Sequence, residues 1–172
     1  MRHICVLGST GSIGVSTLDV IRAYSHLFKV ESLTAHSNIE LLAKQCEEFK
    51  PKMVVLGSAD AANRLNALLK TMGLNISVEH GAEALVTAST LTSVDTVMAA
   101  IVGAAGLLPT IEAAKLGKRI LLANKEALNS VLSAMNQSIT AIQQSLANND
   151  KKTLEDIFTI GNKVYQSIPG KH

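Results

Sequence analysis

The chain has 172 residues, of which 47% are hydrophobic and only 3% aromatic, and its formal net charge is +2. The length suits one domain with a small appendage, and the composition predicts a core of aliphatic side chains. A charge this small, without a basic cluster, argues against a nucleic-acid partner. The lack of an 18-residue apolar run argues against a membrane span. Two cysteines without a CxxC pair indicate neither a disulfide framework nor a zinc site.

Apolar runs and amphipathic stretches alternate along the first 122 residues. The apolar runs predict strands at His3–Leu7, Lys29–Ala35, Met53–Leu56, Ile76–Glu79, Thr96–Ala100 and Arg119–Leu122. The amphipathic stretches predict helices at Ile13–Tyr24, Asn38–Phe49, Asp60–Met72, Ala82–Ser89 and Leu107–Leu116. This alternation is typical of an α/β fold, and we expect a Rossmann-like, doubly wound parallel sheet followed by a C-terminal two-helix extension. Because the first strand begins at once, there is no room for a signal peptide, and we expect a cytoplasmic protein.

The first predicted strand runs directly into a glycine-rich turn, Gly8-Ser9-Thr10-Gly11-Ser12-Ile13-Gly14. Glycines at a strand-to-helix turn let the backbone approach a pyrophosphate, and the start of the following helix can hold negative charge. A glycine turn alone is weak evidence, but its position between a strand and a helix strengthens it. The turn therefore predicts a dinucleotide-binding βαβ unit.

The second predicted strand ends in a segment that carries no acidic residue, Thr34-Ala35-His36-Ser37-Asn38. In a Rossmann-type site an acid at this tip binds the 2′-hydroxyl of NAD, whereas polar or basic residues admit the 2′-phosphate of NADP. The donors available here are His36, Ser37 and Asn38, none of which is a permanent cation. The tip therefore favours NADP.

Two further loops follow predicted strands at the same edge of the sheet. Ala100-Ile101 begins a loop of small residues after the fifth strand, and Asn124-Lys125-Glu126 follows the sixth. Ligands of open α/β sheets bind at this edge, so Lys125 could hold a phosphate while Asn124 and Glu126 bond ribose hydroxyls. The same three residues also suit an ordinary helix start, with Asn as the cap and Glu in the first turn. Both interpretations stay open on these residues alone.

Residues 127–172 show a different pattern, with a heptad seam in place of strands. The seam residues are Leu128, Leu132, Met135, Ile139, Ile142 and Leu146, and a second helix with Leu154, Ile157, Phe158 and Val164 on one face is predicted after Asn148-Asn149-Asp150. This narrow seam indicates a partner helix. Either the hairpin pairs with another copy of the chain, giving a homodimer through residues 127–172, or it packs on its own sheet. A helix of about 20 residues spans ~30 Å, longer than a sheet face usually needs, which favours the homodimer.

The remaining titratable residues give no signal for catalysis. His3, His26 and His80 lack carboxylate or cysteine neighbours at ligand spacing, so surface or packing roles are expected. Asp150, Glu155 and Asp156 lie near a helix start, where acids usually complement the helix dipole, and we predict no metal site there. Cys5 and Cys46 fall on a predicted buried strand and a predicted helix, and packing roles are expected for both.

Three motifs together carry a specific family resemblance. The turn Gly8–Gly14, the segment Ala99-Ala100-Ile101-Val102-Gly103-Ala104-Ala105-Gly106-Leu107-Leu108-Pro109-Thr110 and the segment Leu121-Leu122-Ala123-Asn124-Lys125-Glu126 resemble the N-terminal, NADPH-binding domain of 1-deoxy-D-xylulose 5-phosphate reductoisomerase, an enzyme of the non-mevalonate isoprenoid pathway. The resemblance covers residues 1 to about 128 and predicts a cofactor domain over residues 1–126. It implies that the cofactor phosphates are held by Thr10, Gly11, Ser12 and Ile13. It also implies that His36, Ser37 and Asn38 lie at the adenosine ribose phosphate. After the sixth strand, the resemblance implies that Asn124 and Glu126 lie along the cofactor and that Lys125 contacts the sugar-phosphate substrate.

The chain also departs from this family in two ways. The family often has Gly-Lys-Asn where this chain has His36-Ser37-Asn38, so the lysine that would grip the 2′-phosphate is missing. After the Asn-Lys-Glu motif the family continues into a catalytic domain, where an Asp-Ser-Glu motif and a later glutamate bind a divalent metal (Mn, Mg or Co), and no such motif occurs here. We therefore expect NADPH as the cofactor, no catalytic residues in this chain, and no turnover.

The segment from about Asn124 to the end resembles a second family. Its heptad helix, the Asn148-Asn149-Asp150 break, the second helix and the closing Ile168-Pro169-Gly170-Lys171-His172 are similar to the helical dimerisation region of prephenate dehydrogenases. This resemblance would make the chain a chimera joined near 124–128, and a natural truncated relative with an unrelated tail is the competing account. It also gives an alternative function, an NAD(P)-dependent oxidoreductase with its pocket at a helical dimer interface. A third possibility is an interaction protein with a vestigial nucleotide site.

Overall fold

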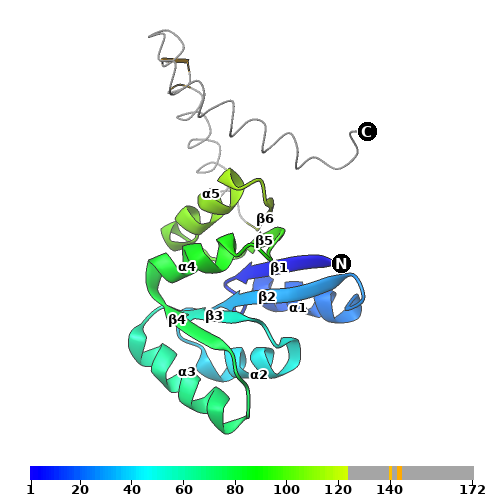
Figure 1. The fold of residues 1–172 in the computed structure, drawn as a ribbon, viewed down its shortest axis with the longest axis vertical. Coiled ribbons are helices and arrows are strands. Elements are labelled where there is room, and N and C mark those ends of the chain that lie inside the picture. Colours follow the sequence, from blue (N-terminus) through cyan, green and yellow to red (C-terminus); the bar gives the residue numbers. More distant parts are fainter. Residues whose placement is uncertain (124–139, 141–142, 145–172) are drawn as a thin grey trace.

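The computed structural model describes residues 1–123, 140 and 143–144 (Figure 1). The strands are β1 (Arg2–Leu7), β2 (Phe28–Thr34), β3 (Met53–Leu56), β4 (Ser77–His80), β5 (Thr96–Ala99) and β6 (Arg119–Leu122). The helices are α1 (Ser12–Ala23), α2 (Ile39–Phe49), α3 (Ala59–Thr71), α4 (Gly81–Thr90) and α5 (Leu107–Lys115), and a short 3-10 turn, η1 (Ala104–Gly106), precedes α5. Every predicted strand and helix within residues 1–123 is confirmed, with its ends displaced by at most one residue.

The six strands form one parallel sheet in the order β4-β3-β2-β1-β5-β6. The strand order reverses direction at β1, so the loops after β1 and β5 diverge at their carboxyl ends, where open α/β sheets bind their ligands. Helices α1, α2 and α3 cover one face, and α4 and α5 cover the other (Figure 1). The predicted Rossmann-like, doubly wound α/β fold is therefore confirmed.

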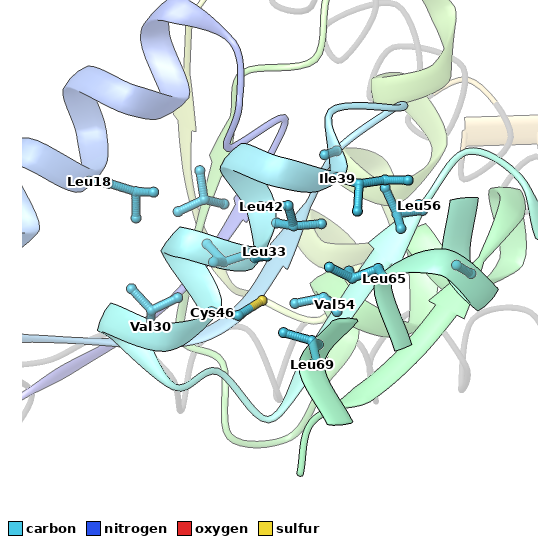
Figure 2. Packing of buried hydrophobic residues seen from close by; sticks show 14 of the residues in the cluster. Leu18, Val30, Leu33, Ile39, Leu42, Cys46, Val54, Leu56, Leu65 and Leu69 are labelled. Carbon is cyan, nitrogen blue, oxygen red and sulfur yellow. The ribbon is translucent and has the colours of Figure 1, made fainter. Parts of the chain in front are cut away.

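The core is aliphatic, as the composition predicts. Its largest cluster lies between the sheet and helices α1–α3, and Figure 2 shows Leu18, Leu42 and Leu65 converging there on strand residues such as Leu33 and Val54. Both cysteines are free and fully buried, Cys46 within this cluster and Cys5 in a second cluster under α5. Burial raises the pKa of each thiol to about 12, so both are packing residues, as expected.

The sequence did not predict the buried carboxylate that lies near the amino ends of the strands. Glu31 in β2 is 0% exposed, and its Oε2 lies 2.7 Å from Lys52 Nζ and accepts a 2.9 Å hydrogen bond from Ser93 Oγ. Its Oε1 lies 2.7 Å from Nδ1 of His3 and 3.2 Å from Lys29 Nζ. Burial alone would raise the pKa of Glu31, but these partners outweigh it and lower that pKa to about 2. His3 has no carboxylate neighbour at ligand spacing along the sequence, but the fold brings Glu31 to it.

The predicted extension over residues 127–172 lies outside the described residues except at three positions. Thr140, Gln143 and Gln144 are helical and exposed. No helix within the described part of the chain has the length and apolar character needed to cross a membrane.

Candidate cofactor site

A pocket of about 580 Å³ opens at the carboxyl ends of the central strands. It is formed by the turn after β1, the tips of β2 and β3, one residue of α4 and the loop after β5. The lining residues are Gly8, Thr10, Gly11, Thr34, Ala35, His36, Ser37, Asn38, Leu56, Gly57, Leu85, Ala100, Ile101, Val102 and Ala105. None of these residues is acidic, so an anionic ligand meets no carboxylate among them.

Close backbone packing in the turn after β1 explains two of its glycines. Gly8 has a φ of +83°, and a Cβ there would lie 3.0 Å from the carbonyl group of Ala100. At Gly14 a Cβ would lie only 2.2 Å from the carbonyl oxygen of Gly8, so α1 begins in direct contact with the turn. At Gly11, in contrast, a Cβ would make an ordinary 3.5 Å contact with that same oxygen. Gly11 therefore marks the open side of the turn, toward the pocket.

Hydrogen bonds fasten this turn to its neighbours. The amide of Gly8 donates to Thr34 Oγ1 at 2.8 Å, and the amide of Ser9 donates to the carbonyl oxygen of Thr34 at 2.8 Å. Below the turn, the buried Ser9 hydroxyl donates to Gln45 Oε1 at 2.7 Å, and Gln45 Nε2 returns a 2.9 Å bond to the Ser9 carbonyl. Because every member of this buried network is satisfied, the turn is held in one conformation before any ligand arrives.

The start of α1 differs from the starts of α2 and α3. The cap residue of α2, Asn38, accepts a 3.1 Å bond from the Leu41 amide, and Ser58 caps α3 in the same way. Both helices also carry an acid in the first turn, whereas α1 has neither a side-chain cap nor an acid there. The first amides of α1 and the positive end of its dipole are therefore available to an anion, directly beside the glycine turn.

The tip of β2 brings His36, Ser37 and Asn38 to the far side of the same pocket. His36 and Ser37 are exposed, and the amide of Gly57 donates to the His36 carbonyl at 3.0 Å. A Cβ at position 57 would lie 2.6 Å from Nδ1 of His36, so the imidazole rests directly against Gly57. The oxygen of the Asn38 side chain is used in capping α2, which leaves its amide nitrogen as the donor for a ligand.

Most of the site residues predicted from the sequence are brought together by the fold. The ones that line the pocket are Gly8, Thr10, Gly11, His36, Ser37, Asn38, Ala100 and Ile101. Ser12 and Ile13 line a separate groove of about 360 Å³ along α1. Asn124, Lys125 and Glu126 lie outside the described residues.

Sequence reasoning did not identify Gly57, Leu85, Val102 and Ala105 as pocket residues. A signal for Gly57 was present, because a glycine directly follows the apolar run of the third strand. Leu85 comes from α4, which crosses to the pocket through tertiary packing, and no local pattern announces that contact. For metals, no group of three His, Cys, Asp or Glu side chains within the described residues is placed to hold an ion.

Comparison with known proteins gives one consistent result. The family described as 1-deoxy-D-xylulose 5-phosphate reductoisomerase matches residues 4–134. The chain is 56% identical over 128 residues to the 1-deoxy-D-xylulose 5-phosphate reductoisomerase of Janthinobacterium sp. (strain Marseille), covering 74% of this chain and 33% of that protein. With the protein of the same name from Dechloromonas aromatica (strain RCB) the identity is 44% over 169 residues, covering 98% of this chain and 40% of that protein.

Solved structures agree with the sequence matches. A crystal structure of DOX-P reductoisomerase in complex with NADPH, fosmidomycin and magnesium matches with a TM-score of 0.71 and 37% identity, over 77% of this chain and 34% of that one. The 1-deoxy-D-xylulose 5-phosphate reductoisomerase from Zymomonas mobilis in complex with NADPH matches with a TM-score of 0.71 and 39% identity, over 83% of this chain and 36% of that one. The chain thus spans 33% to 40% of the length of these two curated relatives.

Proposed function

The chain belongs to the 1-deoxy-D-xylulose 5-phosphate reductoisomerase family, and from this premise we propose that residues 1–126 form an NADP(H)-binding domain. The observation that carries the proposal is the uncapped, acid-free start of α1 beside a rigid glycine turn. An anion there gains backbone donors and a favourable dipole, and loses no existing side-chain cap. The pyrophosphate of the cofactor is the group that this arrangement suits.

Each part of the cofactor then has its own contacts. The pyrophosphate lies at Gly8, Thr10 and Gly11, with the amides of Ser12 and Ile13 completing the cradle at the start of α1. The adenosine ribose and its 2′-phosphate lie at the β2 tip, near His36, Ser37 and Asn38, where the pocket lining has no acid to repel a phosphate. Ala100 and Ile101 lie along the middle of the cofactor, and Asn124 and Glu126 contact it beyond β6. Lys125 contacts the phosphate of the sugar substrate.

We propose that these 172 residues do not carry out hydride transfer or isomerisation by themselves. Bound NADPH supplies the hydride, but the substrate must be held close to the nicotinamide for transfer to occur. The family's Asp-Ser-Glu metal motif has no counterpart in this sequence. The chain therefore binds the cofactor without completing the reaction by itself.

For residues 127–172 we propose a helical unit through which two copies of the chain pair. The uncharged heptad seam supports this proposal. The two-helix pattern supports a unit like that of prephenate dehydrogenases, joined near residues 124–128. The alignment with the Dechloromonas aromatica protein covers 98% of the chain and supports instead a tail that belongs to the reductoisomerase family. Sedimentation of the chain truncated after Leu128 tests the pairing. If the truncated chain is still a dimer, residues 129–172 are not what pairs the two copies.

Titration calorimetry with NADPH and with NADH tests the cofactor proposal. We expect saturable heat with NADPH and weaker binding of NADH, and no heat with either would rule out a nucleotide site. The alternative, an active oxidoreductase with a pocket at a helical dimer interface, predicts turnover. An assay of NADPH oxidation with 1-deoxy-D-xylulose 5-phosphate and Mn²⁺ distinguishes this alternative from a domain that only binds the cofactor. We expect no NADPH oxidation in this assay.

A further inference from the structure

Gln45 is a buried polar residue in a helix whose other buried residues are apolar. It lies in α2 and is 6% exposed. The other buried residues of that helix are Ile39, Leu42, Ala43 and Cys46. Burial of an amide is unfavourable unless its groups find hydrogen-bond partners. Gln45 finds both of its partners in Ser9, in the glycine turn after β1, so the contact with the turn is what makes a buried amide tolerable at this position.

The two hydrogen bonds of Gln45 act on different parts of Ser9. Oε1 of Gln45 accepts a 2.7 Å bond from the Ser9 hydroxyl, and Nε2 donates at 2.9 Å to the Ser9 carbonyl oxygen. The amide of Ser9 has a separate anchor, because it donates to the Thr34 carbonyl at 2.8 Å. Within residues 1–123, however, no other group donates to the Ser9 carbonyl oxygen. In this part of the chain, Gln45 therefore fixes the direction of that carbonyl.

The direction of the Ser9 carbonyl also determines the direction of the next amide. The peptide bond between Ser9 and Thr10 is trans, so its C=O and N–H point to opposite sides. Since the carbonyl points inward to the buried Gln45, the Thr10 N–H points away from it. Thr10 lines the cofactor pocket, and no hydrogen bond among residues 1–123 uses its N–H. This N–H is therefore available to an oxygen atom of a ligand.

We propose that Gln45 is a positioning residue of the cofactor site, which holds the Ser9–Thr10 peptide so that the Thr10 amide donates to a phosphate oxygen. The inference rests on the proposal that the turn after β1 binds the cofactor pyrophosphate. Gln45 acts through Ser9, since it lies beneath the turn and is not among the residues that line the pocket. A donor that is already oriented does not have to be ordered on binding, so loss of Gln45 should weaken binding.

Two variants remove the bond to the Ser9 carbonyl in different ways. Gln45→Met keeps an unbranched side chain of similar length and removes both hydrogen bonds. Gln45→Glu is isosteric with glutamine, and its carboxylate still accepts from the Ser9 hydroxyl but cannot donate to the carbonyl.

The matched control is Cys46→Ala, at the next position of α2. Cys46 is fully buried, in a cluster that contains no residue of the glycine turn. Its truncation removes packing contacts and lowers stability without removing a bond to the turn. The control therefore separates positioning of the peptide from an ordinary loss of stability.

Residual dipolar couplings of the Thr10 N–H, measured by NMR on the full chain without ligand, report the direction of that bond. In the native chain and in Cys46→Ala we expect the coupling of an N–H that points away from Gln45. In both Gln45 variants we expect it to be reduced by roughly half or more, because the peptide samples several orientations. A native coupling that does not fit this direction would overturn the proposal, and so would an unchanged coupling in the Gln45 variants.

Titration calorimetry with NADPH gives the second measurement. We expect binding at least about tenfold weaker in the two Gln45 variants and a change of no more than about twofold in Cys46→Ala. Equal losses in all three variants would mean that Gln45 acts only through stability, and would overturn the proposal. If the native chain binds no NADPH, the cofactor proposal fails, and the dipolar couplings still decide whether Gln45 orients the peptide.

Discussion

The imidazole of His36 fills the space that a side chain at position 57 would need. A Cβ on Gly57 would lie 2.6 Å from Nδ1 of His36 and 3.0 Å from its carbonyl oxygen, and the two residues are joined by a backbone hydrogen bond. The tips of β2 and β3 thereby fix the residue that faces the proposed ribose phosphate. Gly57 is accordingly a positioning residue for nucleotide recognition.

Gly57→Ala is expected to displace the His36 ring and to weaken NADPH binding about tenfold, which corresponds to ~1.4 kcal/mol, with a smaller effect on NADH. Calorimetry with both nucleotides measures the two effects. In a His36→Ala background the same substitution should weaken NADPH binding much less, because the imidazole that it displaces is absent. Equal losses in both backgrounds would mean that Gly57 acts only through the backbone.

Ser37→Lys is expected to strengthen NADPH binding by roughly three- to tenfold, because it adds a cation beside the 2′-phosphate. NADH lacks that phosphate, so its affinity should not change. Ser37→Met is the matched control, since it adds a side chain of similar length without charge. An equal gain for NADH, or a gain with methionine, would place the phosphate elsewhere.

The buried Glu31 should make stability depend on acid pH. Its pKa falls from 4.5 in the unfolded chain to about 2 in the folded protein, so its ion pairs stabilise the fold above pH 4.5 and this contribution is lost as the pH falls toward 2. With half-exposed lysines as partners, we expect a loss of about 2 kcal/mol between pH 6 and pH 2.5.

Urea unfolding of the native chain and of Glu31→Gln over this pH range measures the effect. The variant should be less stable at pH 6, since Lys29 and Lys52 then face a neutral amide in place of a carboxylate, and its stability should change less as the pH falls. Parallel pH profiles for the two proteins would show that the acid sensitivity arises from other carboxylates.

The fold could be predicted from the sequence because its signals are local. The run Met53–Leu56 is apolar at every position and is observed as β3 with those ends, and Asn38 caps α2 as its residue type predicts. The glycine turn was also predictable, because a strand, a turn and a helix follow one another without interruption. These features depend on neighbours along the chain.

The features that were missed depend on contacts between distant segments. Glu31 occupies a buried position of β2, and its burial is tolerable only because the residue before β3, Lys52, and the loop before β5, with Ser93, bring partners to it. Leu85 reaches the pocket from α4, on the opposite face of the sheet from α1. Neither of these contacts produces a periodic pattern in the sequence.

The most direct test of the account is NADPH titration of Gly11→Asp beside Gly11→Ala. Gly11 has an extended backbone with a φ of −77°, and a Cβ there meets nothing closer than 3.5 Å, so both side chains fit without distorting the turn. Circular dichroism should therefore match the native chain, and thermal unfolding should show no loss of stability in either variant. Only aspartate places a carboxylate in the proposed pyrophosphate cradle.

The account predicts that the native chain and Gly11→Ala bind NADPH, with the alanine variant weaker by no more than about fivefold, and that Gly11→Asp loses at least about a hundredfold, or ~2.7 kcal/mol. Equal binding of NADPH by the aspartate and alanine variants would contradict a phosphate at this turn.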